Sequence, residues 1–227
     1  MKKSKTSARA AVPENLPPDL PEGERRAARM RVVAGRRLRG ITVVLDGVHD
    51  PHNISAVLRS CDGFGVQRVH LIGKPDALPI NRLITRGCEK WLHLRYYDAA
   101  SECVAALRKD GFELWAAVPD RKAPALEDID FARRIALLFG AERDGLSDEL
   151  LSACDGRYQI PMPGFSQSLN ISVAAAISVY VATTSRRRAL NRPSDLAPRE
   201  IETLVQAWID QDNARRRGHI SPDSGGQ

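Results

Sequence analysis

Residues 139–178 read FGAERDGLSDELLSACDGRYQIPMPGFSQSLNISVAAAIS. Glycines and prolines punctuate the first part of this stretch, at Gly140, Gly145, Pro161, Pro163 and Gly164. A Ser-Leu-Asn sequence then leads into a segment made almost entirely of small residues, which is typical of a closely packed helix. Glycine allows the backbone to approach another group closely. The stretch therefore predicts loops whose main chain, more than their side chains, surrounds a ligand.

Upstream of this stretch, short apolar runs alternate with helical patterns. The predicted strands are 41–48, 68–73, 91–97, 112–118 and 134–140. Ile54, Val57, Leu58 and Cys61 recur at helical spacing, and Asn53 precedes them as the expected cap. Further helices are expected at 98–110 and 148–154, the latter capped by Ser147. This alternation predicts an α/β fold with a mainly parallel sheet and helices on both faces.

The two ends of the chain differ from this α/β region in composition. Residues 1–40 hold eleven Lys and Arg and four Asp and Glu, a balance of +7 in a chain whose total is +6. Near the C-terminus, apolar residues of 198–211 fall on one helical face, with Pro198 suited to the first turn. We expect a partly disordered basic extension over 1–39, a catalytic domain over 40–185, and a basic linker, helix and tail over 186–227. Both extensions are expected to include helix.

Composition restricts the function classes. The start of the chain is basic without an apolar segment, and no apolar run spans a membrane, so a cytoplasmic protein with no membrane partner is expected. Cys61, Cys88, Cys103 and Cys154 show no pairing pattern and are expected to be mostly buried thiols. His49 and His52 form an HxxH without a third ligand, so no metal is expected. Basic ends flanking a near-neutral centre favour a polyanionic partner.

The common nucleotide motifs do not fit. Gly63-Phe64-Gly65 follows a predicted helix and precedes a strand, the reverse of the dinucleotide-binding order, and lacks the third glycine. No P-loop, GxSxG or HExxH is found in the sequence. A different cofactor arrangement is therefore required.

Three separated motifs supply it. They are NxxAxxR from Asn53 to Arg59, FGxExxGLS from Phe139 to Ser147, and IPMxGxxxSLNxSxA from Ile160 to Ala174. Each alone has an ordinary explanation as a helix face, a turn before a helix, or a proline-rich loop. In this order and spacing they resemble the SPOUT-class RNA 2′-O-methyltransferases, and most closely the TrmH type, which methylate the ribose of tRNA guanosine 18. The resemblance covers roughly residues 40–210.

The resemblance implies a C-terminal deep trefoil knot and a homodimer with the site at its interface. It implies that S-adenosylmethionine is held largely by main-chain groups of Ala117, Gly140, Ile160 and Leu169, with Met162 and Ser168 nearby. Arg59 matches the family's proposed catalytic arginine and is expected to act toward the cofactor of the partner subunit. Asn53 is expected to position that arginine or the ribose, with supporting roles for Glu142 and Asn170.

The implied partner is tRNA. Basic residues in the first motif and the two extensions are the predicted RNA contacts: His52, Arg36, Arg37, Arg186, Arg187 and Arg188. The family often carries two spaced basic residues after the third motif, whereas Thr184 stands at the first such position here. Two alternatives remain open: a ribosomal RNA 2′-O-methyltransferase of the same class, and a non-catalytic RNA-binding factor on the same scaffold.

Overall fold

A computed structural model describes residues 21–219, which form two compact units. The first comprises residues 37–196; the described parts of the second are residues 21–36 and 197–219. The expected disorder of the N-terminal extension falls largely on residues 1–20, outside the described residues.

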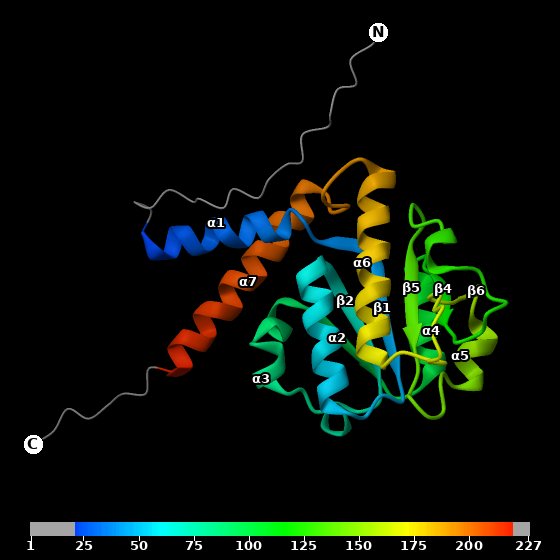
Figure 1. The fold of residues 1–227 in the computed structure, drawn as a ribbon. Coiled ribbons are helices and arrows are strands. Elements are labelled where there is room, and N and C mark those ends of the chain that lie inside the picture. Colours follow the sequence, from blue (N-terminus) through cyan, green and yellow to red (C-terminus); the bar gives the residue numbers. More distant parts are fainter. Residues whose placement is uncertain (1–20, 220–227) are drawn as a thin grey trace, which may run out of the picture. The chain divides into compact units, whose positions relative to one another are not determined.

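The larger unit is built on one six-stranded sheet with the order β3-β2-β1-β5-β4-β6 (Figure 1). Its strands are β1 (Leu38–Asp46), β2 (Val66–Ile72), β3 (His93–Tyr97), β4 (Glu113–Ala117), β5 (Ile135–Phe139) and β6 (Gly156–Tyr158). Every pairing between them is parallel, which confirms the predicted parallel sheet. β6 was not predicted, because three residues are too short to show a period of two.

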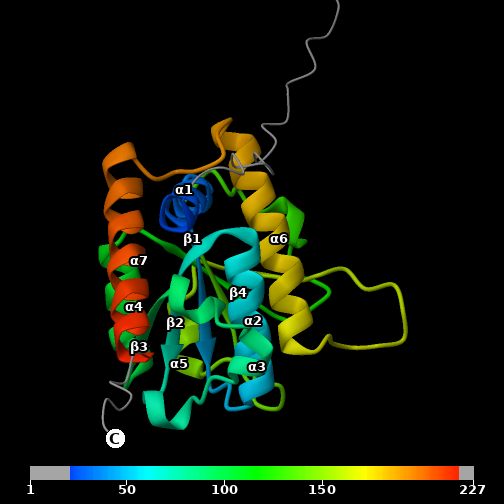
Figure 2. The same ribbon diagram turned by 90° about the vertical axis from the view of Figure 1, so that its left-hand side faces the viewer.

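Helices cover both faces of the sheet, as predicted. They are α2 (Pro51–Phe64), α3 (Arg82–Thr85), α4 (Ala100–Lys109), α5 (Asp148–Ala153) and α6 (Ile171–Leu190), with 3₁₀ turns at Pro75–Ala77, Cys88–Trp91 and Leu126–Asp128. Val43 and Leu137 share one buried cluster with residues of α2 and α6. Val44 and Leu138 share the other with residues of α4 and α5. Figure 2 shows α2 and α6 side by side on their face.

The start of α2 differs from the prediction in a way that matters for the site. Asp50, not Asn53, caps the helix: its carboxylate accepts a hydrogen bond from the His52 amide at 2.8 Å, and Pro51 occupies the first turn. Asn53 therefore lies inside the first turn, and its side chain is available for other contacts. Gly65 ends the helix in the left-handed conformation (φ 89°), which explains the Gly63-Phe64-Gly65 sequence.

The smaller unit pairs two helices, α1 (Glu22–Ala34) and α7 (Pro198–His219). α7 begins at Pro198 as predicted, and the helical extensions are confirmed. Arg26 and Asp212 form an ion pair between the helices at 2.5 Å. Over residues 21–219, no helix is both long enough and apolar enough to cross a membrane.

The cysteines agree with the sequence interpretation. All four are free; Cys61, Cys88 and Cys103 are buried and Cys154 is half-buried. Burial raises the pKa of the Cys61 and Cys103 thiols, so neither is a ready nucleophile at neutral pH.

Candidate active site and cofactor cavity

A cavity of about 570 Å³ lies at the carboxyl ends of β4, β5 and β6. Parallel α/β sheets commonly bind their ligands at this edge. The structure brings all six predicted cofactor residues to the wall of this cavity: Ala117, Gly140, Ile160, Met162, Ser168 and Leu169. They come from three separate loops, so the cavity exists only in the folded chain.

The loop after β5 shows why this wall needs glycine. Ala141 and Gly145 pair across a tight turn, with amide-to-carbonyl distances of 3.0 and 2.9 Å. Gly145 takes φ +69°, and a Cβ on Gly140 would lie 2.0 Å from the Gly145 carbonyl carbon. Any side chain at Gly140 would therefore displace the turn. The turn projects residues 142–144 to the cavity wall.

A polar cluster stands at one side of the cavity and joins the three motifs. Asn53 donates from Nδ2 to Oε1 of Glu142 at 3.1 Å, and Asn170 donates to the same oxygen at 2.7 Å. The Nδ2 group of Asn170 also lies 3.1 Å from Oδ1 of Asn53. Glu142 and Asn170 line the cavity. Because a carboxylate only accepts hydrogen bonds, Glu142 fixes the orientation of both amides.

Asn170 has a second role at the start of α6. Its Oδ1 accepts hydrogen bonds from the Ser172 amide at 2.9 Å and from the Ser172 hydroxyl at 2.6 Å. It therefore caps the small-residue helix while its amide group holds Glu142. One residue links the third motif, the helix and the polar cluster.

Arg59 is placed differently from the other three predicted catalytic residues. It is exposed, lies outside the described residues that line the cavity, and donates from Nη1 to the Ile84 carbonyl at 3.3 Å. Arg59 follows Asn53 by six residues on α2. Six residues correspond to about 9 Å along a helix and place Arg59 on a different side of α2 from Asn53. Within one chain, the structure groups Asn53, Glu142 and Asn170 but leaves Arg59 apart.

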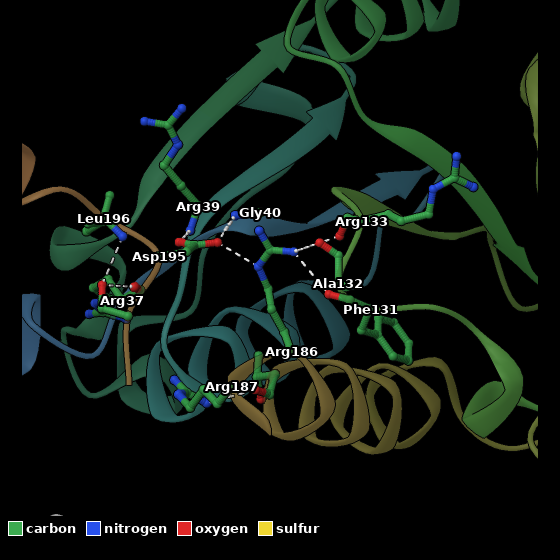
Figure 3. A network of polar contacts seen from close by, with 12 residues as sticks. Arg37, Arg39, Gly40, Phe131, Ala132, Arg133, Arg186, Arg187, Asp195 and Leu196 are labelled. Carbon is green, nitrogen blue, oxygen red and sulfur yellow. Dashed lines mark hydrogen bonds and ion pairs between the residues drawn. The ribbon is translucent and has the colours of Figure 1, made fainter. Parts of the chain in front are cut away.

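Two of the predicted RNA-binding residues are corrected by the structure. Arg186 is buried, pairs with Asp195 at 2.6 Å, and donates to the carbonyls of Phe131, Ala132 and Arg133 (Figure 3). Arg37 is buried as well and pairs with Asp62. Neither guanidinium group is accessible to a phosphate, because both are enclosed among protein acceptors.

The remaining RNA-binding candidates have varied surroundings. Arg187 is half-buried and donates to the carbonyls of Pro193 and Phe64 at 3.0 and 2.9 Å. Arg36 is half-buried. His52 and Arg188 are exposed, and His52 adjoins Asn53 in the first turn of α2. His52 and Arg188 therefore remain the best placed of the six predicted contacts.

Sequence reasoning missed Tyr158 as part of the cavity wall. It belongs to the unpredicted strand β6, is fully buried, and donates its hydroxyl to the Ser178 hydroxyl on α6 at 3.0 Å. Burial raises the pKa of the Tyr158 phenol, so it is a neutral structural group rather than a base. A possible signal was its place directly before the Gln-Ile-Pro of the third motif.

The fold and the cavity define an α/β protein with a cofactor-sized site built from loops at the carboxyl edge of its sheet. Residues 40–180 match the SpoU rRNA methylase family, and the chain belongs to that family. It is 37% identical over 188 residues to the tRNA (guanosine(18)-2′-O)-methyltransferase of Thermus thermophilus, covering 82% of this chain and 96% of the relative.

Solved structures agree with this assignment. The A. aeolicus TrmH/SpoU tRNA modifying enzyme superposes with a TM-score of 0.76 at 30% identity, covering 84% of this chain and 98% of that one. The SpoU methyltransferase AviRb from Streptomyces viridochromogenes, in complex with the cofactor AdoMet, gives a TM-score of 0.56 at 28% identity. That match covers 65% of this chain and 60% of the other.

Proposed function

We propose that this protein transfers the methyl group of S-adenosylmethionine to the ribose 2′-hydroxyl of guanosine 18 in tRNA, in the cytoplasm. The observation that carries the proposal is the cavity at the carboxyl edge of the sheet, bordered by the Asn53–Glu142–Asn170 cluster. The Thermus relative, which this chain matches along nearly all of that protein's length, supports tRNA as the substrate.

The residues of the cavity fit S-adenosylmethionine. A volume of about 570 Å³ is within the usual range for a cofactor-sized ligand. Ala117, Ile160 and Leu169 give apolar walls, and Gly140 lets the main chain approach closely. Main-chain carbonyls and amides of these residues would hold the adenine and ribose. The bound cofactor supplies an electrophilic methyl group on a cationic sulfur.

The acceptor side of the reaction requires loss of a proton from the ribose 2′-hydroxyl. With the cofactor bound, the ribose oxygen would accept its methyl group, and the sulfur would keep the electron pair of the carbon–sulfur bond. The proton leaves to the neighbouring RNA phosphate or to water. Arginine remains protonated in proteins, so Arg59 acts by holding the phosphate and stabilising the developing alkoxide charge. Asn53, oriented by Glu142, positions the ribose.

Arg59 can play this role if it reaches the cavity of a second subunit. α6 carries large apolar side chains on its surface at Val173, Ile177 and Tyr180, which are 46%, 36% and 54% exposed. Their spacing of four and three residues places them along one side of the helix. The proposal therefore includes a homodimer that buries this side of α6. It also includes the C-terminal trefoil knot that the family resemblance implies within the predicted 40–185 domain.

Replacing Ile177 with glutamate should convert the protein to a monomer and abolish methyl transfer. A carboxylate in the centre of an apolar interface would be desolvated without a partner. Light scattering after size exclusion measures the mass, and the same fractions are assayed. Ser101→Glu, at an exposed position on α4, is the matched control and should stay dimeric. A dimeric, active Ile177→Glu protein would contradict this interface.

The proposed reaction is tested with a tRNA transcript and S-adenosylmethionine labelled in the methyl group. We expect label in tRNA and 2′-O-methylguanosine at position 18 by nucleotide mapping. A transcript with 2′-deoxyguanosine at that position should accept none, because the acceptor oxygen is missing. If a ribosomal RNA transcript accepted label in the same assay and tRNA accepted none, the ribosomal alternative would be favoured. RNA binding without any calorimetric signal from S-adenosylmethionine would favour the non-catalytic factor.

A further inference from the structure

A group of basic side chains lies near the amino ends of the strands, at the end of the sheet opposite the cavity. Arg68 begins the part of β2 that pairs with β3 and lies beside His93 of β3, and His70 lies beside Arg95. Residues two apart on a strand share a face, so these four point to the side of the sheet covered by α4. Arg134 precedes β5 and packs over the Phe112 ring at 4.5 Å.

Arg39 joins this group because of an irregularity in β1. The register of β1 against β2 shifts between Leu38 and Thr42. As a result Gly40 faces Arg186 on α6, and Figure 3 shows the side chain of Arg39 directed away from Arg186. In the pairing of β1 with β5, Ile41 lies beside Ile135, so Arg39 and Arg134 both come just before neighbouring positions of the two strands. Burial and then the charge of Arg39 lower the pKa of Arg134. We name this group the β2–β3 basic patch: Arg39, Arg68, His93, Arg95 and Arg134.

Two carboxylates of the described residues act on this group, Asp110 and Asp195, and Asp195 is already paired with Arg186. Asp110, at the end of α4, pairs with Arg68. Burial alone would raise the pKa of Asp110, but the hydrogen bond from Arg68 and the charges of Arg95 and Arg134 lower it. Asp110 is thus a carboxylate at neutral pH, beside the guanidinium groups of Arg68, Arg95 and Arg134. Burial and the charges of Arg68 and Arg95 lower the pKa of His93, which is therefore a neutral hydrogen-bonding group.

His70 and Tyr97 pack against each other beside the patch. His70 is buried, and its Nδ1 lies 2.9 Å from the Tyr97 hydroxyl, with the two rings stacked at 5.6 Å. Burial raises the pKa of the Tyr97 phenol, and the nearby Arg95 lowers it. Arg95 is nevertheless exposed, as are Arg39 and His93. Exposed arginines spaced along neighbouring strands can contact successive phosphates of a nucleic-acid backbone, which a single small anion does not provide.

We infer that the β2–β3 basic patch binds the phosphate backbone of the RNA substrate, at a distance from the methylated nucleotide. This inference rests on the proposed tRNA substrate and extends its contact surface to a part of the domain outside the three motifs. Contacts of this kind contribute affinity that depends on salt and not on sequence. They should leave the chemical step unchanged.

The test uses the double variant Arg39→Gln/Arg95→Gln, because both side chains are exposed and their loss should not unfold the domain. Filter binding of an unmodified tRNA transcript is measured over a series of KCl concentrations. We expect the Kd to rise about tenfold at low salt, and the slope of log K against log salt to fall by about one to two. The rate at saturating tRNA and the Kd for S-adenosylmethionine should match wild type.

Arg157→Gln is the matched control. Arg157 is an exposed arginine on β6, the edge strand at the other side of the sheet, and should change the Kd less than twofold. A double variant with wild-type Kd and salt slope would overturn the inference while leaving the proposed function intact. Failure of the proposed function looks different, since wild-type protein itself would then not methylate tRNA, whether or not it bound tRNA.

Discussion

Replacing Arg59 with alanine is expected to reduce methyl transfer to tRNA by about a hundredfold or more, with little change in cofactor affinity or stability. Removing one preorganised donor that stabilises developing negative charge costs about 10²–10³ in rate in other enzymes. Arg59 is exposed and makes one long hydrogen bond, to the Ile84 carbonyl at 3.3 Å, so the fold should tolerate its loss. Single-turnover kinetics with labelled cofactor measure the rate, and calorimetry measures cofactor binding.

Two further variants sharpen this test. Arg59→Lys keeps the charge but loses the planar fork that grips a phosphate, so only partial activity should return. Arg82→Ala removes a neighbouring exposed arginine of α3 whose ion pair with Glu89 is long, at 3.9 Å, and should be nearly silent. Unchanged turnover in Arg59→Ala would remove this arginine from the mechanism.

The first motif does not determine which cavity Arg59 serves. The spacing of the apolar residues Ile54, Val57, Leu58 and Cys61 predicts a helix that carries Arg59, and α2 confirms it. In the folded chain Asn53 bonds to Glu142 on one side of α2, whereas Arg59 points toward Ile84. That separation, together with the apolar side of α6, is the structural reason for placing Arg59 at the partner's cavity.

Most of the sheet follows from local sequence, whereas the residues of the cavity wall follow from the family resemblance. Continuous apolar runs such as residues 134–140 mark buried parallel strands, and glycines mark the turn that approaches the cofactor. The helix start was wrong by a few residues, because Asp50 followed by Pro51 caps better than Asn53 can when Asn53 is needed elsewhere. β6 depends on pairing with β4 and could not be seen locally.

Charge was harder to interpret than hydrophobicity. In sequence, Arg186-Arg187-Arg188 is a uniform basic run that predicts an exposed RNA contact. In the structure the three side chains differ: Arg186 is buried, Arg187 is half-buried and Arg188 is exposed. A helix turns about 100° per residue, so neighbours in a run face different surroundings. The partners that bury Arg186 lie nine residues later and more than fifty residues earlier, beyond any local pattern.

Replacing Arg186 with alanine is therefore expected to destabilise the protein by about 3–5 kcal/mol, the usual cost of removing one partner of a buried ion pair. The Asp195 side chain is 2% exposed and, among the donors described over residues 21–219, would keep the amides of Arg39 and Gly40, at 2.6 and 2.9 Å. The carbonyls of residues 131–133 would also lose their donor. Urea unfolding followed by circular dichroism measures the change in the free energy of unfolding.

Arg188→Ala is the matched control two residues along the same helix, and it separates structural from RNA-binding roles. Arg188 is exposed, so its loss should change the free energy of unfolding by less than about 0.5 kcal/mol. It should weaken tRNA binding instead, since an exposed arginine can neutralise a phosphate. If Arg186→Ala left stability unchanged and weakened tRNA binding as Arg188→Ala does, the original prediction for Arg186 would be right. The enclosed ion pair with Asp195 argues that the two variants will separate, one losing stability and the other losing affinity.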